Sequence, residues 1–134
     1  MKLLLDTNAY SALMAGVPDA RRIVSLAEHV YLPLPVIGEL LFGFQMGSRA
    51  GKNLERLQAF LAQPVVSLAG VDFEVCEVYA RVGRQLRQAG TPVPTNDHWI
   101  ASIAIRNNGT LLTRDRHFDA IAGLAVVHWE DGGE

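Results

Sequence analysis

The chain of 134 residues contains one cysteine, only two lysines and no apolar run long enough to cross a bilayer. A lone cysteine forms no internal disulfide, which fits a reducing compartment. A spanning helix needs roughly 18 apolar residues, but charged or polar residues interrupt every hydrophobic segment here. The first apolar run lies between Lys2 and Asp6 and is too short for a signal peptide. We therefore expect a cytoplasmic protein without a membrane segment.

An excess of charge of one sign is also missing, because 14 acidic and 12 basic residues give a net charge of −2. This balance argues against a protein that holds nucleic acid by charge alone. If four of the acids were metal ligands, however, the remaining 10 would face 12 bases and the outer surface would be slightly cationic. The net charge therefore leaves a nucleic-acid substrate open.

Hydrophobic residues make up 49% of the chain, and no repeat, linker or low-complexity tract divides it, so residues 1–134 are expected to form a single domain. Short apolar runs predict strands at 2–5, 30–32, 65–68, 110–113 and 125–128. Helical spacing predicts helices at 19–29, 36–47, 53–62, 72–88 and 97–107. Alternating strands and helices predict an α/β fold, with a central, mostly parallel sheet of about five strands between two helical layers.

The predicted helix at 36–47 is apolar on two sides. Its broad core stripe is predicted to contain Val36, Ile37, Leu40, Leu41 and Phe44. Phe42 and Met46 lie one turn apart on the other side, where we consider a second core contact, a dimer seam or a groove for a partner, and favour an interface.

The predicted helix at 72–88 has Asp72 as its cap and Gly90 beyond its end. Its apolar stripe is predicted to contain Phe73, Cys76, Tyr79 and Gly83, which makes the thiol a packing group rather than a nucleophile.

Four carboxylates are predicted at one edge of the sheet. Asp6 directly follows the first strand, and Asp115 follows the fourth strand by two residues. Glu39 lies in the second turn of the helix after the second strand, and Asp97 opens the helix at 97–107. Open parallel sheets bind ligands beyond the carboxyl ends of their strands. We therefore expect these acids to form one site.

Structural explanations compete with this interpretation. Asp6 can simply end a strand, and Asp97 can simply charge a helix N-terminus. Glu39 is harder to explain in that way, because its helix is otherwise largely apolar and an unpaired buried acid is unfavourable. Asp119 also follows the fourth strand, but we interpret it as a cap or surface acid and rank it below Asp115.

Carboxylates gathered in one cleft repel one another unless a divalent cation is bound. Their oxygens suit Mg²⁺ or Mn²⁺, which activate water and neutralise charge on a phosphoryl oxygen, so a phosphodiester is the expected substrate. Nearby polar residues, Thr7, Asn8 and Thr113, are expected to support the acids. Arg114 and Arg116 flank Asp115 and are interpreted either as phosphate contacts or as surface residues. No metal-binding spacing is found for His29, His98, His117 and His128.

Four blocks of sequence surround these acids: LLDTN at 4–8, PVIGEL at 35–40, NDHWIA at 96–101 and LLTRDRHF at 111–118. In their order and spacing they resemble the PIN-domain nucleases, and among them the VapC-like toxins of bacterial toxin–antitoxin pairs. The resemblance implies a PIN-like fold and metal-dependent RNA cleavage by a homodimer that a partner antitoxin silences. It also implies that the metal-binding and catalytic acids are Asp6, Glu39, Asp97 and Asp115, supported by Thr7 or Asn8 and by Thr113.

Three other functions compete with a Mg²⁺-dependent ribonuclease. Aspartyl-phosphate chemistry of the haloacid-dehalogenase type needs a second aspartate two residues after the first, where this chain has Asn8. A phospho-accepting receiver domain needs a lysine after a late strand, and the only lysines are Lys2 and Lys52. A PIN-fold module that binds protein or RNA without catalysis is disfavoured by the acids but stays open.

Overall fold

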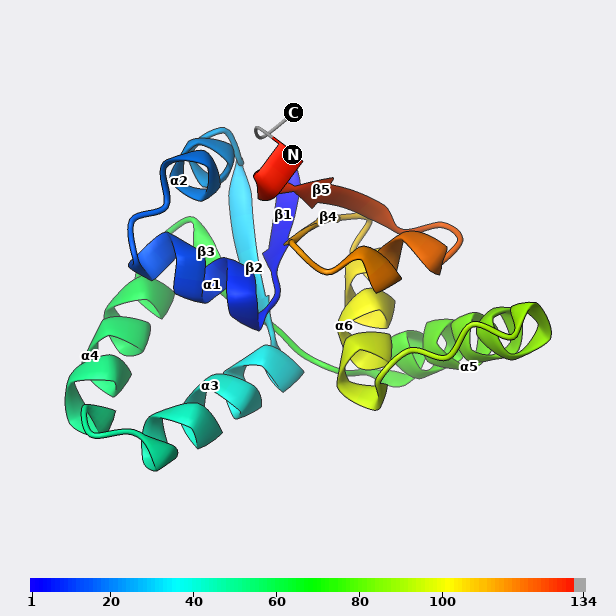
Figure 1. Cartoon of the computed structure of the whole chain (residues 1–134), viewed down its shortest axis with the longest axis horizontal. Coiled ribbons are helices and arrows are strands. Elements are labelled where there is room, and N and C mark those ends of the chain that lie inside the picture. The colour runs from blue at the N-terminus through cyan, green and yellow to red at the C-terminus, as the bar shows by residue number, and fades with distance from the viewer. Residues whose placement is uncertain (132–134) are drawn as a thin grey trace.

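The computed structural model describes residues 1–131 and contains a five-stranded sheet with helices on both faces (Figure 1). The strands are β1 (Lys2–Leu5), β2 (His29–Pro33), β3 (Val66–Ala69), β4 (Thr110–Thr113) and β5 (Ala125–His128). The α-helices are α1 (Thr7–Met14), α2 (Pro18–Ser25), α3 (Leu34–Met46), α4 (Ala50–Leu61), α5 (Phe73–Ala89) and α6 (Thr95–Arg106). Two short 3-10 helices follow the last two strands, η1 (Arg116–Ala120) and η2 (Trp129–Asp131).

The sheet has the strand order β3-β2-β1-β4-β5, and every neighbouring pair is parallel. This confirms the predicted α/β class and the five strands, and it makes the sheet entirely rather than mostly parallel. β1 is the central strand, and its three leucines are fully buried. This burial is expected of a strand that is covered on both faces. The predicted strand positions are confirmed to within one or two residues.

The chain reverses its direction of travel across the sheet after β3. From β1 it moves outward through β2 to β3, and then it returns to β4 on the other side of β1. Because parallel crossovers are right-handed, this reversal places α5 and α6 on the face opposite α1 to α4, as the two sides of Figure 1 show. The carboxyl ends of β1 and β4 therefore form the switch point at which open α/β sheets bind ligands.

The observed helices differ from the predicted ones at two places near the N-terminus. α1 was not predicted, although Asp6 caps it by accepting a hydrogen bond from the Ala9 amide at 2.8 Å. α2 ends at Ser25, four residues before the predicted end of that helix at 29. On α3, Leu41 was predicted to be in the core and is instead exposed, whereas Leu40 is buried.

The buried face of α5 was also predicted incorrectly. Its core residues are Val75, Val78, Val82 and Leu86. Cys76 and Phe73 are exposed, so the thiol is not the packing group that the sequence pattern indicated. The predicted ends of this helix are confirmed: Asp72 caps it by accepting from the Val75 amide, and Gly90 has a φ of 67° beyond its last turn.

Among the described residues, no helix is both long enough and apolar enough to cross a membrane.

Candidate active site

Asp6 lies at the carboxyl end of β1 and is only 4% exposed. Its two carboxylate oxygens have different partners. Oδ1 accepts from the Ala9 amide at 2.8 Å, and Oδ2 accepts from the Thr113 hydroxyl at 2.5 Å. The side chain thus caps α1 and also joins the end of β1 to the end of β4.

Thr113 connects Asp6 to the next acid. Its hydroxyl donates to Asp6 and accepts from the backbone N–H of Asp115 at 3.0 Å. Since Thr113 is fully buried, it fixes the backbone from which the Asp115 side chain projects. Thr113 was predicted as a supporting polar residue, and the structure places it between Asp6 and the backbone of Asp115.

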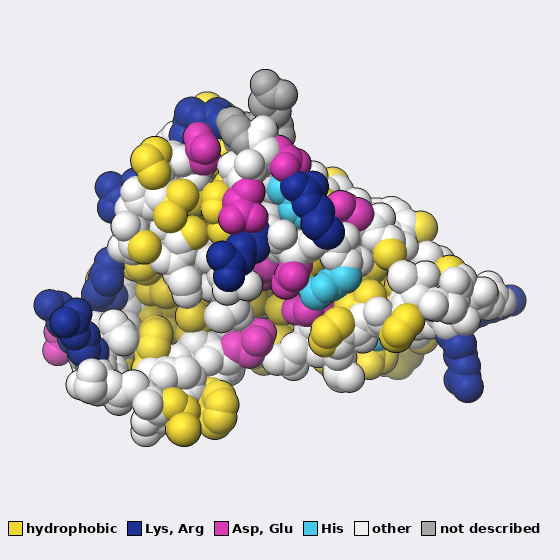
Figure 2. All heavy atoms as spheres, in the orientation of Figure 1, with side chains coloured by type: hydrophobic (Ala, Val, Ile, Leu, Met, Phe, Trp, Pro, Cys, Tyr) yellow, Lys and Arg dark blue, Asp and Glu magenta, His cyan; other side chains and the backbone are white. Residues whose placement is uncertain are grey.

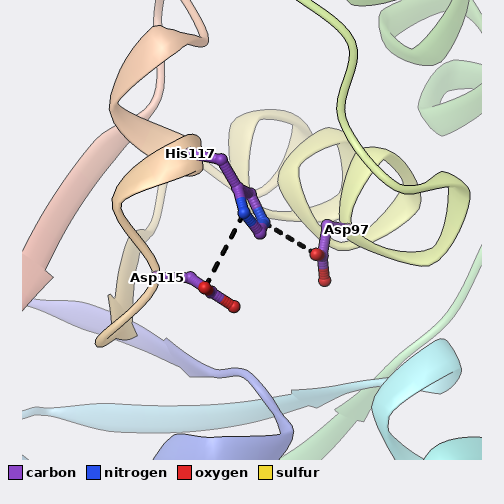
Figure 3. Close-up of side chains that lie close together, drawn as sticks. All are labelled: Asp97, Asp115 and His117. Carbon is purple, nitrogen blue, oxygen red and sulfur yellow. Dashed lines mark hydrogen bonds and ion pairs between the residues drawn. The ribbon is translucent and has the colours of Figure 1, made fainter.

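His117 lies between two of the acids (Figure 3). Its Nε2 is 2.7 Å from Oδ2 of Asp97, which is in the first turn of α6, and its Nδ1 is 3.7 Å from Oδ1 of Asp115. No histidine was predicted to be a metal ligand, because no regular spacing connects His117 to the acids, yet its ring lies beside two of them. His117 is the second residue of η1, and the turn of this helix directs its ring toward Asp97 and Asp115.

Glu39 belongs to the same region through a different contact. It lies in the second turn of α3 and is half-buried, and its Oε1 accepts from the Thr7 hydroxyl at 3.1 Å. Thr7 directly follows Asp6, so the first turn of α1 connects Glu39 to the end of β1. Figure 2 shows acidic side chains and a histidine gathered on this part of the surface.

The carboxylates influence one another's ionisation. Burial raises the pKa of Asp6 to about 6, against the lowering effect of its bonds to Thr113 and Ala9, and the charges of Asp115 and Asp97 raise it further. Burial also raises the pKa of Asp97, although the contact with His117 opposes the shift. We refer to Asp6, Asp97, Asp115 and His117 as the acid site.

The acid site fits a divalent cation in its chemistry. Ligand atoms of Asp97, Asp115 and His117 lie within 4.8 Å of one another. Carboxylate oxygens suit Mg²⁺ and Mn²⁺, and an imidazole nitrogen is also a ligand for first-row transition ions. A cation here would favour the ionised form of Asp6, whose pKa is raised by burial and, to a smaller extent, by the neighbouring carboxylates.

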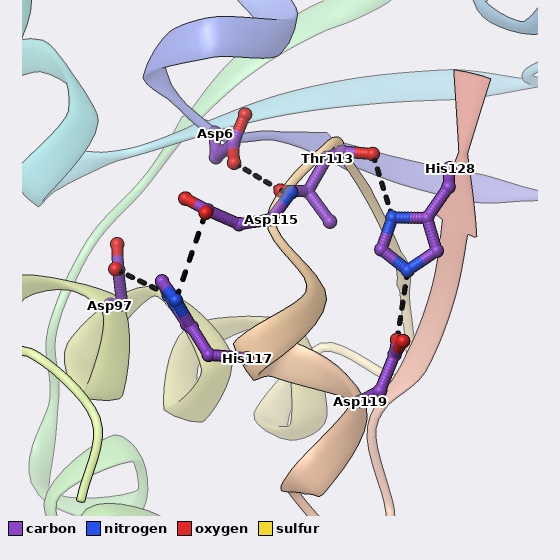
Figure 4. Close-up of polar contacts among 7 residues, drawn as sticks. All are labelled: Asp6, Asp97, Thr113, Asp115, His117, Asp119 and His128. Atoms are coloured by element: carbon purple, nitrogen blue, oxygen red, sulfur yellow. Dashed lines mark hydrogen bonds and ion pairs between the residues drawn. The ribbon is translucent and has the colours of Figure 1, made fainter. Parts of the chain in front are cut away.

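The remaining predicted residues lie around the acid site rather than in it. Asn8 is exposed and has no hydrogen bond to an acid among residues 1–131; it lines a hollow of about 650 Å³ together with Arg114. Arg116 forms an ion pair with Asp131. Asp119 lies on the other side of η1 and contacts His128 (Figure 4), so the structure separates it from the four predicted acids.

Phe42 and Met46 are among the most exposed large hydrophobic residues described, at 69% and 75%. They do not form a second core contact, so that alternative is wrong. In Figure 2, apolar side chains are visible over α3 at the lower left. A helix that is apolar on the side facing solvent is characteristic of an interface.

Comparison with known proteins agrees with this geometry. The family model described as PIN domain matches residues 3–124. Ribonuclease VapC4 of Mycobacterium tuberculosis is 31% identical over 127 residues, which cover 94% of this chain and 95% of that protein. The plasmid stability protein StbB of Pseudomonas syringae pv. tomato is 31% identical over 96% of this chain and 99% of its own length.

Solved structures show the same fold. A chain of the VapBC2 complex of Rickettsia felis, bound to a DNA fragment from its promoter, superposes with a TM-score of 0.86 and is 25% identical, covering 96% of this chain and 99% of that one. FitAcB of Neisseria gonorrhoeae superposes with a TM-score of 0.71 at 29% identity, covering 92% of this chain and 95% of that one. On the family match and these relatives together, the chain belongs to the PIN-domain family and, within it, to the VapC-like proteins.

Proposed function

We propose that this protein is a metal-dependent endoribonuclease and the toxin of a toxin–antitoxin pair. Its similar proteins include several named VapC ribonucleases, and solved structures of the same fold are VapBC toxin–antitoxin complexes. The observation that carries the proposal is the acid site, where three carboxylates from separate elements converge at the switch point of the sheet.

Asp6, Asp97 and Asp115 would hold one or two Mg²⁺ or Mn²⁺ ions, with Glu39 as the fourth acid. A bound divalent cation lowers the pKa of a water molecule and neutralises charge on a phosphoryl oxygen. Thr113 orients Asp6 and the backbone of Asp115, while Thr7 orients Glu39. No side chain of the chain acts as a nucleophile in this mechanism.

Arg114 is the cation best placed to contact the RNA backbone. It directly precedes Asp115, is exposed and has no ion-pair partner within residues 1–131, whereas Arg116 is held by Asp131. An arginine beside the acids can bind a phosphate oxygen on either side of the scissile bond. We also propose that the protein acts in the cytoplasm, in keeping with its single cysteine.

The experiment that tests the proposal is cleavage of a mixed RNA pool by the purified protein in Mg²⁺, in Mn²⁺ and in chelator. An Asp6→Asn variant purified in the same way is the control, since asparagine also caps a helix. We expect metal-dependent cleavage by the wild type only. Cleavage that survives in the variant would mean a contaminating nuclease. The absence of cleavage by either protein would favour the binding module without catalysis.

We further propose that the exposed face of α3 binds the antitoxin. Phe42 and Met46 lie one turn apart on this face, and Leu41 beside them is also exposed. A partner that covers this face removes three large apolar side chains from water, at roughly 25 cal/mol for each Å² buried. A dimer seam is the alternative occupant of this face, since the resemblance also implies a homodimer.

A further inference from the structure

His128 ends β5 and is 7% exposed, and each of its ring nitrogens contacts an acceptor oxygen. Nδ1 is 3.2 Å from the backbone carbonyl oxygen of Thr113, and Nε2 is 2.8 Å from Oδ1 of Asp119. Neither contact belongs to the regular bonding of the sheet. The buried histidine thus connects the end of β4 to a side chain of η1.

The two partners of His128 are the two ends of one short loop. Thr113 precedes Asp115, and Asp119 follows His117, so the residues between the two contacts are 114–118 (Figure 4). Asp115 and His117, the two residues of the acid site that follow β4, therefore lie in a segment whose flanking residues both contact His128. In Figure 4 they point to one side of η1, and His128 lies on the other side.

The loop also has other contacts. Phe118 is fully buried, and the Asp115 amide donates to the Thr113 hydroxyl. On the outer side, Arg116 pairs with Asp131 and His117 contacts Asp97. The Asp115 side chain caps no helix, because η1 has no side-chain cap bond. Its carboxylate position thus depends on the backbone between Thr113 and Asp119, and His128 contacts both of these residues.

We propose that His128 and Asp119 are positioning residues that hold the loop 114–118 so that Asp115 and His117 face Asp6 and Asp97. Neither residue touches the substrate or a metal ion. This inference rests on the proposed function, because a metal site is what the loop is positioned to complete. Groups that orient metal ligands in this way change metal affinity by roughly 10- to 100-fold when they are removed.

Asp119 is the residue to change, because 48% of its side chain is exposed and its replacement leaves the core intact. Asp119→Ala removes the acceptor of His128 Nε2, whereas Asp119→Asn keeps an acceptor oxygen. We expect Mn²⁺ to bind Asp119→Ala roughly 10-fold more weakly than wild type, and Asp119→Asn to bind within about threefold of wild type. Mn²⁺ binding is measured by calorimetry on the full chain, without RNA.

Amide hydrogen exchange provides a second measurement that does not depend on activity. We expect faster exchange in residues 114–118 of Asp119→Ala and unchanged exchange in α5. His29→Gln is the matched control, since this histidine also connects two segments of the sheet, through a 2.8 Å contact with Ser67, but outside the acid site. It should leave Mn²⁺ binding unchanged.

The outcomes separate this inference from the proposed function. Mn²⁺ affinity that is the same in Asp119→Ala and wild type would overturn the positioning role, whatever the exchange data show. Equal losses in Asp119→Asn and Asp119→Ala would overturn the hydrogen bond as its cause. A wild type that binds Mn²⁺ no better than Asp6→Asn does would overturn the metal site itself, and with it both proposals.

Discussion

At the scale of single residues, Asp6 has two tasks that oppose each other. It caps α1 and accepts from Thr113, which favours the carboxylate, but its burial beside Asp97 and Asp115 favours the protonated form. Burial is the stronger influence, since the pKa rises from 3.8 to about 6. Without a cation, the folded protein is therefore destabilised by the ionised Asp6 side chain.

The sign of this effect predicts how stability depends on pH. Between 3.8 and about 6 the folded protein keeps a proton on Asp6 that the unfolded chain releases, and this stabilisation is lost as the pH rises through about 6. In chelator at pH 8, Asp6→Asn should therefore be more stable than wild type, by at most about 3 kcal/mol. The difference should shrink as the pH falls toward 4. Thermal unfolding of both proteins across this range measures it.

Metal ions supply the control for this prediction. Mg²⁺ at pH 8 should raise the unfolding temperature of the wild type, because the cation binds only the folded state. It should raise that of Asp6→Asn much less. A variant that is less stable than wild type at pH 8 in chelator would show that the capping and threonine contacts of the carboxylate outweigh its burial and the charges of its neighbours.

At the scale of helices and strands, the sequence pattern predicted the sheet better than it predicted the helix faces. Buried parallel strands are short apolar runs, and each is found where it was expected. On α5, however, Val75 and Val78 repeat with the same helical spacing as Phe73 and Cys76. Spacing alone does not distinguish these two faces, because the choice depends on which side meets α6 and the sheet.

The predicted site shows the same division. Three of the predicted acids converge: Asp6, Asp97 and Asp115. Each stands at the end of a strand or at the start of a helix, and the sequence pattern reveals these positions. His117 could not be found in this way, because its approach to Asp97 depends on the turn of η1. α1 could have been predicted from the sequence, because Asp6 is an ordinary N-cap residue for the segment that follows it.

The N-cap of α5 gives a prediction at this scale. Asp72 accepts from the Val75 amide at 2.9 Å, so Asp72→Ala should lower the free energy of unfolding by about 1 kcal/mol. Asp72→Ser keeps a capping oxygen, so its free energy of unfolding is expected to fall much less. Urea denaturation of the two variants measures the difference. RNA cleavage should be unchanged in both, because α5 contributes no side chain to the acid site; a loss of cleavage at unchanged stability would contradict this.

At the scale of the whole molecule, the surface carries apolar groups that no described element covers. On α3 these are Leu41, Phe42 and Met46, and at the start of α5 there is Phe73. Exposed apolar clusters of this kind mark surfaces that another protein covers. Asp6, Asp97 and Asp115 lie outside α3, whereas Glu39 shares α3 with this face and contacts Thr7. Changes restricted to Phe42 and Met46 leave all four acids in place, so inhibition by a partner and catalysis can be tested separately by mutation.

A double variant, Phe42→Ser with Met46→Ser, should test this separation. It removes two large apolar anchors, which is expected to weaken antitoxin binding by roughly 10- to 100-fold. Cleavage by the free toxin should not change, and a fixed concentration of antitoxin should inhibit the variant less than it inhibits wild type. Binding is measured by calorimetry and inhibition by RNA cleavage.

Phe73→Ser is the matched control, because Phe73 is an equally exposed aromatic residue on α5. It should bind the antitoxin as the wild type does. If the α3 double variant instead keeps its antitoxin affinity and dissociates from a dimer into monomers in light scattering, the α3 face is a dimer seam and the assignment to the antitoxin is wrong.

The strand order has a consequence for when this protein can act. Asp6 and the Thr113 that holds it are 107 residues apart in the chain, yet β1 and β4 are neighbours in the sheet. A nascent chain therefore has the first of the proposed catalytic acids long before it has the last. At roughly 5–20 residues per second, several seconds of synthesis separate the two. Under the proposed function, a polypeptide that is released early, before Asp97 and Asp115, would carry an incomplete site and would not cleave RNA.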